Sequence, residues 1–113
     1  METTGFITVF VTVPSAEEAN TMAKTLVQRR LAACVNIVPG ITSHYWWKNS
    51  PTVSPEWLLI VKTREVLFDE VEAAIKVAGS YSVPDILALP IVRGSSISLA
   101  WMDKELKGYE ERC

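Results

Sequence analysis

Few side chains in this sequence can ligate a soft metal ion. His44 is the single histidine, and Cys34 and Cys113 are the two cysteines. A tight transition-metal site usually needs three or four ligands at a defined spacing. Cys34 follows two alanines, as a small buried hydrophobic residue does, and His44 lies beside aromatic residues, as a packing histidine does. We therefore expect no secure metal site in one chain, with Cys34 and His44 as weak candidates.

Motifs for catalysis are absent. The sequence contains no GxSxG nucleophile turn, no Ser/His/Asp order and no GxxxxGK[ST] phosphate loop. Acidic pairs such as Glu17-Glu18 and Glu110-Glu111 fall on predicted helix surfaces or in the tail, where solvated carboxylates are common. The sequence therefore predicts a protein that is not an enzyme, and no motif in it indicates a particular cofactor.

Composition predicts one folded domain. The 113 residues are 49% hydrophobic and 21% charged, which excludes a disordered chain, and no shift in composition divides residues 1–113. Eleven basic side chains against thirteen acidic ones give a net charge of −2. A nucleic-acid-binding domain usually shows a basic excess, so we expect no nucleic-acid partner.

The cysteine and hydropathy patterns predict a cytoplasmic protein. Two cysteines 79 residues apart form no disulfide framework, so a reducing compartment is the simpler interpretation. The N-terminal residues lack the basic and apolar regions of a signal peptide. The uncharged stretch 31–47 is interrupted by Pro39-Gly40 and several polar residues, so we expect no membrane span.

The chain alternates between strand and helix periodicity. Alternation predicts strands at 6–13, 34–47, 56–63 and 84–92, and three-to-four spacing predicts helices at 15–31, 63–79 and from Ser95 or Ser96 to Gly108. Pro39-Gly40 predicts a bulge within the second strand, and 49–55 predicts the turn that follows it. Ser15 and Glu18 predict a capping box in which Glu18 reaches back to the Ser15 amide, and Gly79 is the predicted C′ residue.

This β-α-β-β-α-β order predicts an α+β, ferredoxin-like (split β-α-β) fold. In such a fold two helices cover one face of a four-stranded antiparallel sheet, and here a short C-terminal helix follows. The other sheet face should be polar in a monomer. Instead, both faces carry apolar residues. Phe6 and Phe10 oppose the valine face of the first strand, and in the third strand Leu58 and Ile60 point one way while Trp57, Leu59 and Val61 point the other. We expect a closed homo-oligomer; the alternative is that the terminal helix folds over the open face.

Several segments resemble the CutA divalent-cation tolerance family. They are 12–14 (TVP), 30–37 (RLAACVNI), 39–43 (PGITS), 45–47 (YWW), 56–63 (EWLLIVKT), 89–91 (LPI) and 99–101 (LAW), spread over nearly the whole chain. The resemblance implies a single CutA-like domain at residues 1–113, assembled as a homotrimer. It also implies a role in the response to divalent metal ions such as copper, with no enzymatic activity.

The resemblance implies at most weak copper binding. Copper-binding bacterial relatives carry a cysteine late in the first strand and one or two histidines before a Pro-Tyr. The matching positions here are Val11, Ala78 and Gly79, none of which has a ligating side chain. Copper or another divalent cation would therefore be held weakly.

A second interpretation is a ligand-sensing or scaffolding trimer. Trimers of this build place small molecules in clefts between subunits, and here the ligand would be an anion or a metabolite. Five polar or amphipathic residues match family positions at strand ends: Cys34, Glu56, Lys62, Tyr81 and Trp101. Their alternative role is packing and hydrogen bonding between subunits.

Overall fold

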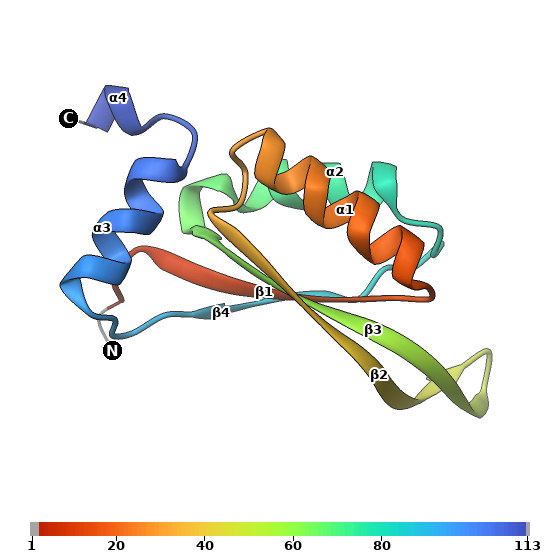
Figure 1. Cartoon of the computed structure of the whole chain (residues 1–113). Helices are drawn as coiled ribbons and strands as arrows, with labels where there is room; N and C mark the ends of the chain where they lie inside the picture. The colour runs from red at the N-terminus through yellow and green to blue at the C-terminus, as the bar shows by residue number, and fades with distance from the viewer. Residues whose placement is uncertain (1–2, 113) are drawn as a thin grey trace.

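Alternating apolar residues build one antiparallel sheet with the strand order β2-β3-β1-β4. The computed structural model describes residues 3–112, so Cys113 lies outside the described residues. The strands are β1 (Phe6–Val13), β2 (Cys34–Trp47), β3 (Ser50–Arg64) and β4 (Ile86–Pro90); the helices are α1 (Ala16–Gln28), the 3-10 turn η1 (Glu65–Leu67), α2 (Phe68–Ala78), α3 (Ser96–Glu105) and α4 (Tyr109–Arg112). The predicted ferredoxin-like α+β fold is confirmed. Figure 1 shows α1 and α2 on the same face of the sheet.

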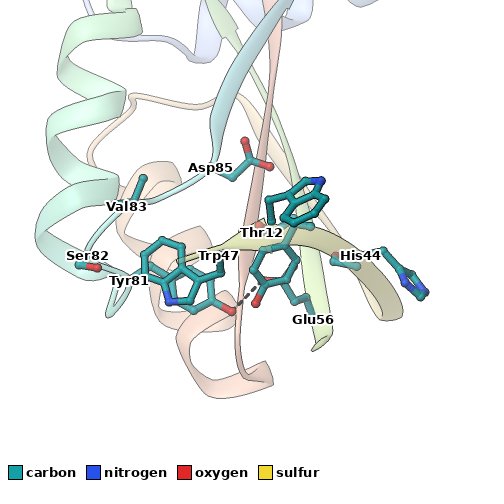
Figure 2. A pocket seen from close by; sticks show the side chains of 11 residues that line it. Thr12, His44, Trp47, Glu56, Tyr81, Ser82, Val83 and Asp85 are labelled. Atoms are coloured by element: carbon teal, nitrogen blue, oxygen red, sulfur yellow. Dashed lines mark hydrogen bonds between the residues drawn. The ribbon is translucent and has the colours of Figure 1, made fainter. Parts of the chain in front are cut away.

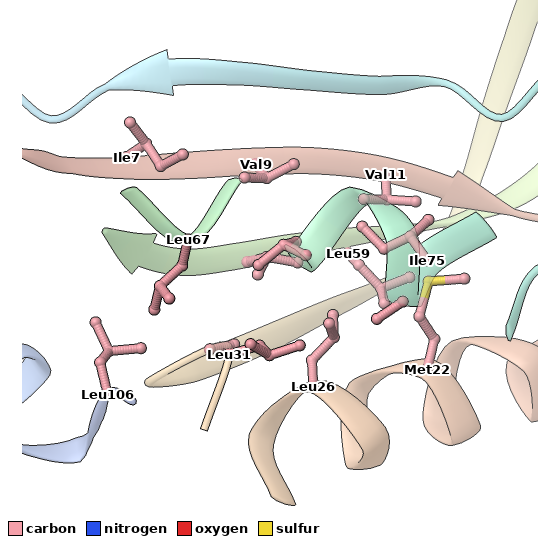
Figure 3. Close-up of a cluster of buried hydrophobic side chains, with 14 of the residues drawn as sticks. Ile7, Val9, Val11, Met22, Leu26, Leu31, Leu59, Leu67, Ile75 and Leu106 are labelled. Carbon is pink, nitrogen blue, oxygen red and sulfur yellow. The ribbon is translucent and has the colours of Figure 1, made fainter. Parts of the chain in front are cut away.

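The core lies between these two helices and the sheet. Val9 of β1 pairs with Val61 of β3, and both are fully buried, as the two-residue period requires. The helices supply residues at three-and-four spacing, which places one apolar stripe against the sheet. Figure 3 shows Met22, Leu26 and Ile75 packed against the sheet. The buried residues of the two helices are Ala19, Met22, Leu26, Val71, Ala74 and Ile75.

The turn of the β2–β3 hairpin differs from the prediction. Residues 49–55 were expected to be the turn, but β3 begins at Ser50 and only Lys48 and Asn49 connect the strands. Both have positive φ, 48° and 63°, as a two-residue type I′ hairpin turn demands. Pro51 and Pro55 fit within β3 because β1 does not reach this part of the strand, and an unpaired edge needs no N–H donor.

The predicted bulge at Pro39-Gly40 is confirmed. The β2–β3 register shifts between Val38 and Ile41, and Gly40 has a φ of 67°. A bulge bends the strand and increases its local twist.

One predicted helix start and two predicted features of helix ends are corrected. Thr63 does not open α2; it is a buried residue of β3 whose hydroxyl donates to the Leu31 carbonyl at 2.6 Å, and η1 precedes α2. Gly79 ends α2 in an extended conformation, φ −87°, and not in the left-handed one. Ser15 caps α1 as predicted, but a Glu18 carboxylate oxygen accepts from the Ser80 amide at 3.1 Å. A long-range partner replaces the expected local one.

The last three elements of the chain also differ in part from the prediction. β4 is shorter than the predicted strand at 84–92, and α4 was not predicted. Ser95 caps α3 as expected, its hydroxyl accepting from the Ser98 amide. α3 stands at one end of the sheet (Figure 1), where Asp103 pairs with Arg64 at 3.0 Å. The alternative in which this helix covers the open face is wrong, because Phe10 and Leu87 on that face stay 37% and 61% exposed.

Candidate functional site

The β2–β3 hairpin is longer than the sheet to which it belongs. β1 pairs with β3 only from Trp57 to Arg64, whereas β2 and β3 stay paired as far as Trp47 and Ser50. Residues 41–56 therefore form a two-stranded arm that projects beyond the sheet (Figure 1). An isolated two-stranded ribbon is marginally stable at best in water. This arm needs support from outside the sheet.

The arm and the loop between α2 and β4 enclose a cleft of about 720 Å³, here called the arm cleft. Its lining comes from β1, both strands of the arm and the loop: Thr12, Ser43, His44, Tyr45, Trp46, Trp47, Glu56, Tyr81, Ser82, Val83 and Asp85. Small-molecule sites commonly have volumes of about 300–1,000 Å³. The arm cleft is therefore large enough for an organic ligand.

Glu56 and Tyr81 meet in this cleft. Glu56 lies where β3 leaves the sheet and is only 5% exposed, and the Tyr81 hydroxyl donates to its carboxylate at 2.7 Å. Figure 2 shows this bond as the dashed line. Burial, and then the hydrogen bond to the Glu56 carboxylate and its negative charge, raise the pKa of the Tyr81 phenol above its ordinary value. Tyr81 is thereby kept as a protonated donor.

The electrostatic character of the cleft is acidic. Two carboxylates line it, Glu56 and Asp85, and its lining includes neither lysine nor arginine. Its other lining residues include two tyrosines and two tryptophans, with Trp46 left 74% exposed. His44 also belongs to the lining, but its ring is directed away from Glu56 and Tyr81 in Figure 2. The arrangement can attract a cation or donate and accept hydrogen bonds.

The residues predicted for an inter-subunit cleft fall into separate places in one chain. Glu56 and Tyr81 are joined in the arm cleft. Cys34 and Lys62 are cross-strand partners elsewhere in the sheet, on the face away from the helices. Trp101 lies on α3 and is half exposed. A cleft shared by all five across subunits stays a prediction.

Some cleft residues were not singled out from the sequence. Asp85 is not among the residues that the sequence singles out, and the aromatic run 45–47 enters only as one of the segments that resemble the family. The contact between Glu56 and Tyr81 spans 25 residues. The sequence signal that could have located the cleft is the run of three aromatic residues at 45–47. These residues lie next to a predicted hairpin turn, where no core packing explains them.

The described residues do not fit the copper site of the family within one chain. In residues 3–112, no three His, Cys, Asp or Glu side chains gather to hold a metal ion. The resemblance implies that Val11, Ala78 and Gly79 stand at the copper-ligand positions, and the structure places Val11 buried beneath the helices. Val11 and Gly79 do line one small cavity of about 10 Å³, so the fold brings two of these positions together, but neither offers a ligating atom.

These features define a class: a ferredoxin-like α+β protein with an extended hairpin arm, an open apolar sheet face and an acidic, aromatic cleft at the base of the arm. Residues 7–105 match the model of the family described as "CutA1 divalent ion tolerance protein". The chain belongs to this family. In the part of the chain that the structure covers, helices long and apolar enough to span a membrane are absent.

Individual relatives agree with the family. The chain is 49% identical over 94 residues to the "Divalent-cation tolerance protein CutA" of Thermus thermophilus, covering 83% of this chain and 91% of that one. It is 46% identical over 96 residues to "Protein CutA 1, chloroplastic" of Oryza sativa, covering 85% of this chain but only 54% of the rice protein. The crystal structure of CutA1 from Oryza sativa superposes with a TM-score of 0.89 at 43% identity, covering 93% of this chain and 96% of that one.

Proposed function

We propose that this chain acts as a cytoplasmic, non-enzymatic homotrimer in divalent-cation tolerance. The observation that carries the proposal is the sheet face opposite the helices, where Phe10, Leu87 and Leu89 are exposed. Monomers rarely leave such a contiguous apolar patch in water. Burying about 600 Å² of it per subunit would favour association by about 15 kcal/mol before the entropic costs of assembly. The number of three copies comes from the family resemblance.

The arm supports the same assembly. Trp46, Trp47 and Val53 expose apolar area on the two-stranded ribbon that projects beyond the rest of the sheet (Figure 1). Contact with a neighbouring copy would stabilise the ribbon and remove this area from water. A second copy of the chain would therefore cover both the open face and the arm.

The metal is proposed to be bound weakly, if directly, by this chain. The donor set supports this, because the family's cysteine and histidine positions hold Val11, Ala78 and Gly79. Calorimetric titration with Cu²⁺ should give a dissociation constant above about 1 μM. A stoichiometric site of sub-micromolar affinity would contradict weak binding.

The role in tolerance is tested in cells. A strain that lacks this chain should grow less well than its parent in medium with raised Cu²⁺, and the wild-type chain should restore growth. The Leu87→Lys variant, which places a charge on the open face, should not restore it, because an unpaired buried charge opposes assembly. Equal growth with and without the chain would contradict the proposed function.

Small-ligand sensing is a second candidate function, and the arm cleft supports it. The cleft is of ligand size and combines apolar rings with a few polar groups, as binding sites commonly do. A thermal-shift screen of metal ions, organic cations and organic anions tests it. Stabilisation by an organic compound supports sensing, whereas stabilisation by metal ions alone opposes it.

A further inference from the structure

We propose that Lys62 of one subunit pairs with Glu56 of the partner subunit where the open faces of the sheets meet. This ion pair would set the direction and the register of the interface between copies. The inference rests on the assembly proposed above and adds the residues that orient it. It does not depend on small-ligand sensing.

The strands of the sheet carry few charged side chains. In the described strands, Glu56 is the one acidic residue, and Lys62 and Arg64 are the lysine and the arginine. Arg64 is already paired with Asp103 at 3.0 Å. The ion pairs found within residues 3–112 involve neither Glu56 nor Lys62. The sheet therefore has one acid and one base without a charged partner.

These two residues lie on the open face of β3. Val61 and Thr63, on either side of Lys62, are fully buried, so the side chain of Lys62 is directed to the open face. Glu56 is six positions earlier, and the nearby bulge adds its extra residue to β2, so the alternation along β3 is intact. At about 3.3 Å per residue, about 20 Å separates the two positions, too far for an ion pair within one chain.

Assembly through the open face would bury both charges. Leu58 and Ile60 lie between them on the same face, so a second copy that covers these two residues also covers Lys62. Glu56 is already only 5% exposed, and its carboxylate accepts a bond from Tyr81, a neutral donor. A buried charge without an opposite charge is strongly destabilising. Assembly therefore favours an arrangement in which each charge meets an opposite one.

The symmetry of a trimer supplies this arrangement. A closed ring of three copies uses head-to-tail interfaces, in which one patch of a subunit meets a different patch of the next. The open face carries a base toward one end of β3 and an acid where β3 leaves the sheet, so it is complementary to itself in such a ring. A slipped register would leave both charges buried and unpaired, which disfavours it.

Other charged residues near the arm have no need of a partner. Lys48 lies in the hairpin turn and Asp85 lies just before β4, and both are exposed. Water solvates such groups, and surface ion pairs contribute little to stability. Lys48 therefore provides a matched control for Lys62.

A crystal structure of the assembled full-length protein tests the contact directly. We expect Lys62 Nζ within about 4 Å of a carboxylate oxygen of Glu56 of the partner subunit at each interface. A trimer in which Lys62 is solvated, or is paired with another residue, would overturn the ion pair and leave the proposed assembly intact. A chain that stays monomeric in solution would overturn both.

A double-mutant cycle tests whether the two charges are coupled. Glu56→Gln and Lys62→Met each leave one buried charge unpaired, and glutamine can still accept the bond from Tyr81. Each single variant should speed subunit exchange between two fluorescently labelled pools at least about tenfold. The double variant removes both charges and should exchange more slowly than either single variant. Circular dichroism confirms that each variant is folded.

Lys48→Met is the control for charge and side-chain type. It removes a lysine from the exposed hairpin turn and should leave the exchange rate unchanged, both alone and together with Glu56→Gln. Independent, multiplying effects of Glu56→Gln and Lys62→Met on the exchange rate would overturn the ion pair. A Lys62→Met variant that exchanges as slowly as the wild type would do so as well.

Discussion

The two faces of the sheet share the same strands but have opposite surroundings. On β1, Val9 is fully buried beneath the helices, whereas its neighbour Phe10 is 37% exposed on the other face. On β3, Leu59 is buried and Ile60 is only partly covered. The covered face is complete within one chain, and the open face carries apolar residues such as Phe10, Leu87 and Leu89 that nothing in the described chain covers. The buried face therefore specifies the fold, and the other face is available for assembly.

The largest effect is expected on the covered face. Leu59→Ala removes a fully buried side chain from a closed core and should lower the free energy of unfolding by about 3.5 kcal/mol, because the lost transfer energy and the remaining cavity add. Urea unfolding followed by circular dichroism measures it. Leu87→Ala on the open face is the control, and its unfolding at a fixed low protein concentration should change by less than about 1 kcal/mol. Similar losses of stability for the two variants would contradict the difference between the covered and the open face.

The second effect is on assembly. Leu87→Lys should weaken association at least about 100-fold, or about 2.7 kcal/mol, because three copies would bury unpaired ammonium groups. Analytical ultracentrifugation over a series of concentrations measures the change. The far-ultraviolet circular dichroism of the dissociated chain should remain that of the wild type. Glu72→Lys on α2, a helix on the covered side of the sheet in Figure 1, provides a control that should assemble normally.

The third effect concerns the base of the arm. Tyr81→Phe removes the only described hydrogen-bond donor to the Glu56 carboxylate and should cost about 1.5 kcal/mol at neutral pH, since a buried acceptor loses its partner. Thermal unfolding of variant and wild type measures this loss. No loss of stability would show that the bond does not support the cleft.

The same pair gives a pH dependence. The folded state raises the pKa of the Tyr81 phenol, so the stabilisation from its protonated form is complete below the ordinary tyrosine pKa of about 10 and is lost as pH rises beyond it. The stability difference between wild type and Tyr81→Phe should therefore shrink as pH rises above about 10. Urea midpoints measured from pH 8 upward test it, and a difference that grows with pH would contradict the raised pKa.

The smallest effect is at the bulge. Gly40 has a φ of 67°, and a Cβ there would meet nothing within 4 Å, so only backbone strain opposes a side chain. Gly40→Ala should lower the free energy of unfolding by about 1 kcal/mol. Chemical denaturation measures it against Gly40→Asn, which should cost less because asparagine tolerates this conformation. Equal stability of all three proteins would show that the bulge relaxes freely.

Local patterns in the sequence were sufficient for the fold. The alternation in β1 and the Ser15 cap of α1 are properties of neighbouring residues, so they were predicted correctly. The hairpin turn was missed because Pro51 and Pro55 outweighed the less obvious Lys48-Asn49 pair. Prolines are tolerated there only because β1 ends before the arm begins, which is a tertiary fact.

The candidate site was only partly predictable for the same reason. Glu56 and Tyr81 were named separately, but their hydrogen bond depends on how the loop after α2 returns to the base of the arm. Glu18 likewise bonds to Ser80, 62 residues away, and not to its own helix cap. Contacts of this range are set by packing, which periodicity does not encode.

Sedimentation equilibrium of the full-length chain at micromolar concentration is the most direct test of the uncovered sheet face and the arm as a surface for other copies. A single species of three times the 12.6 kDa chain mass is the expected result. A stable, well-folded species of 12.6 kDa that does not grow with concentration would contradict the account.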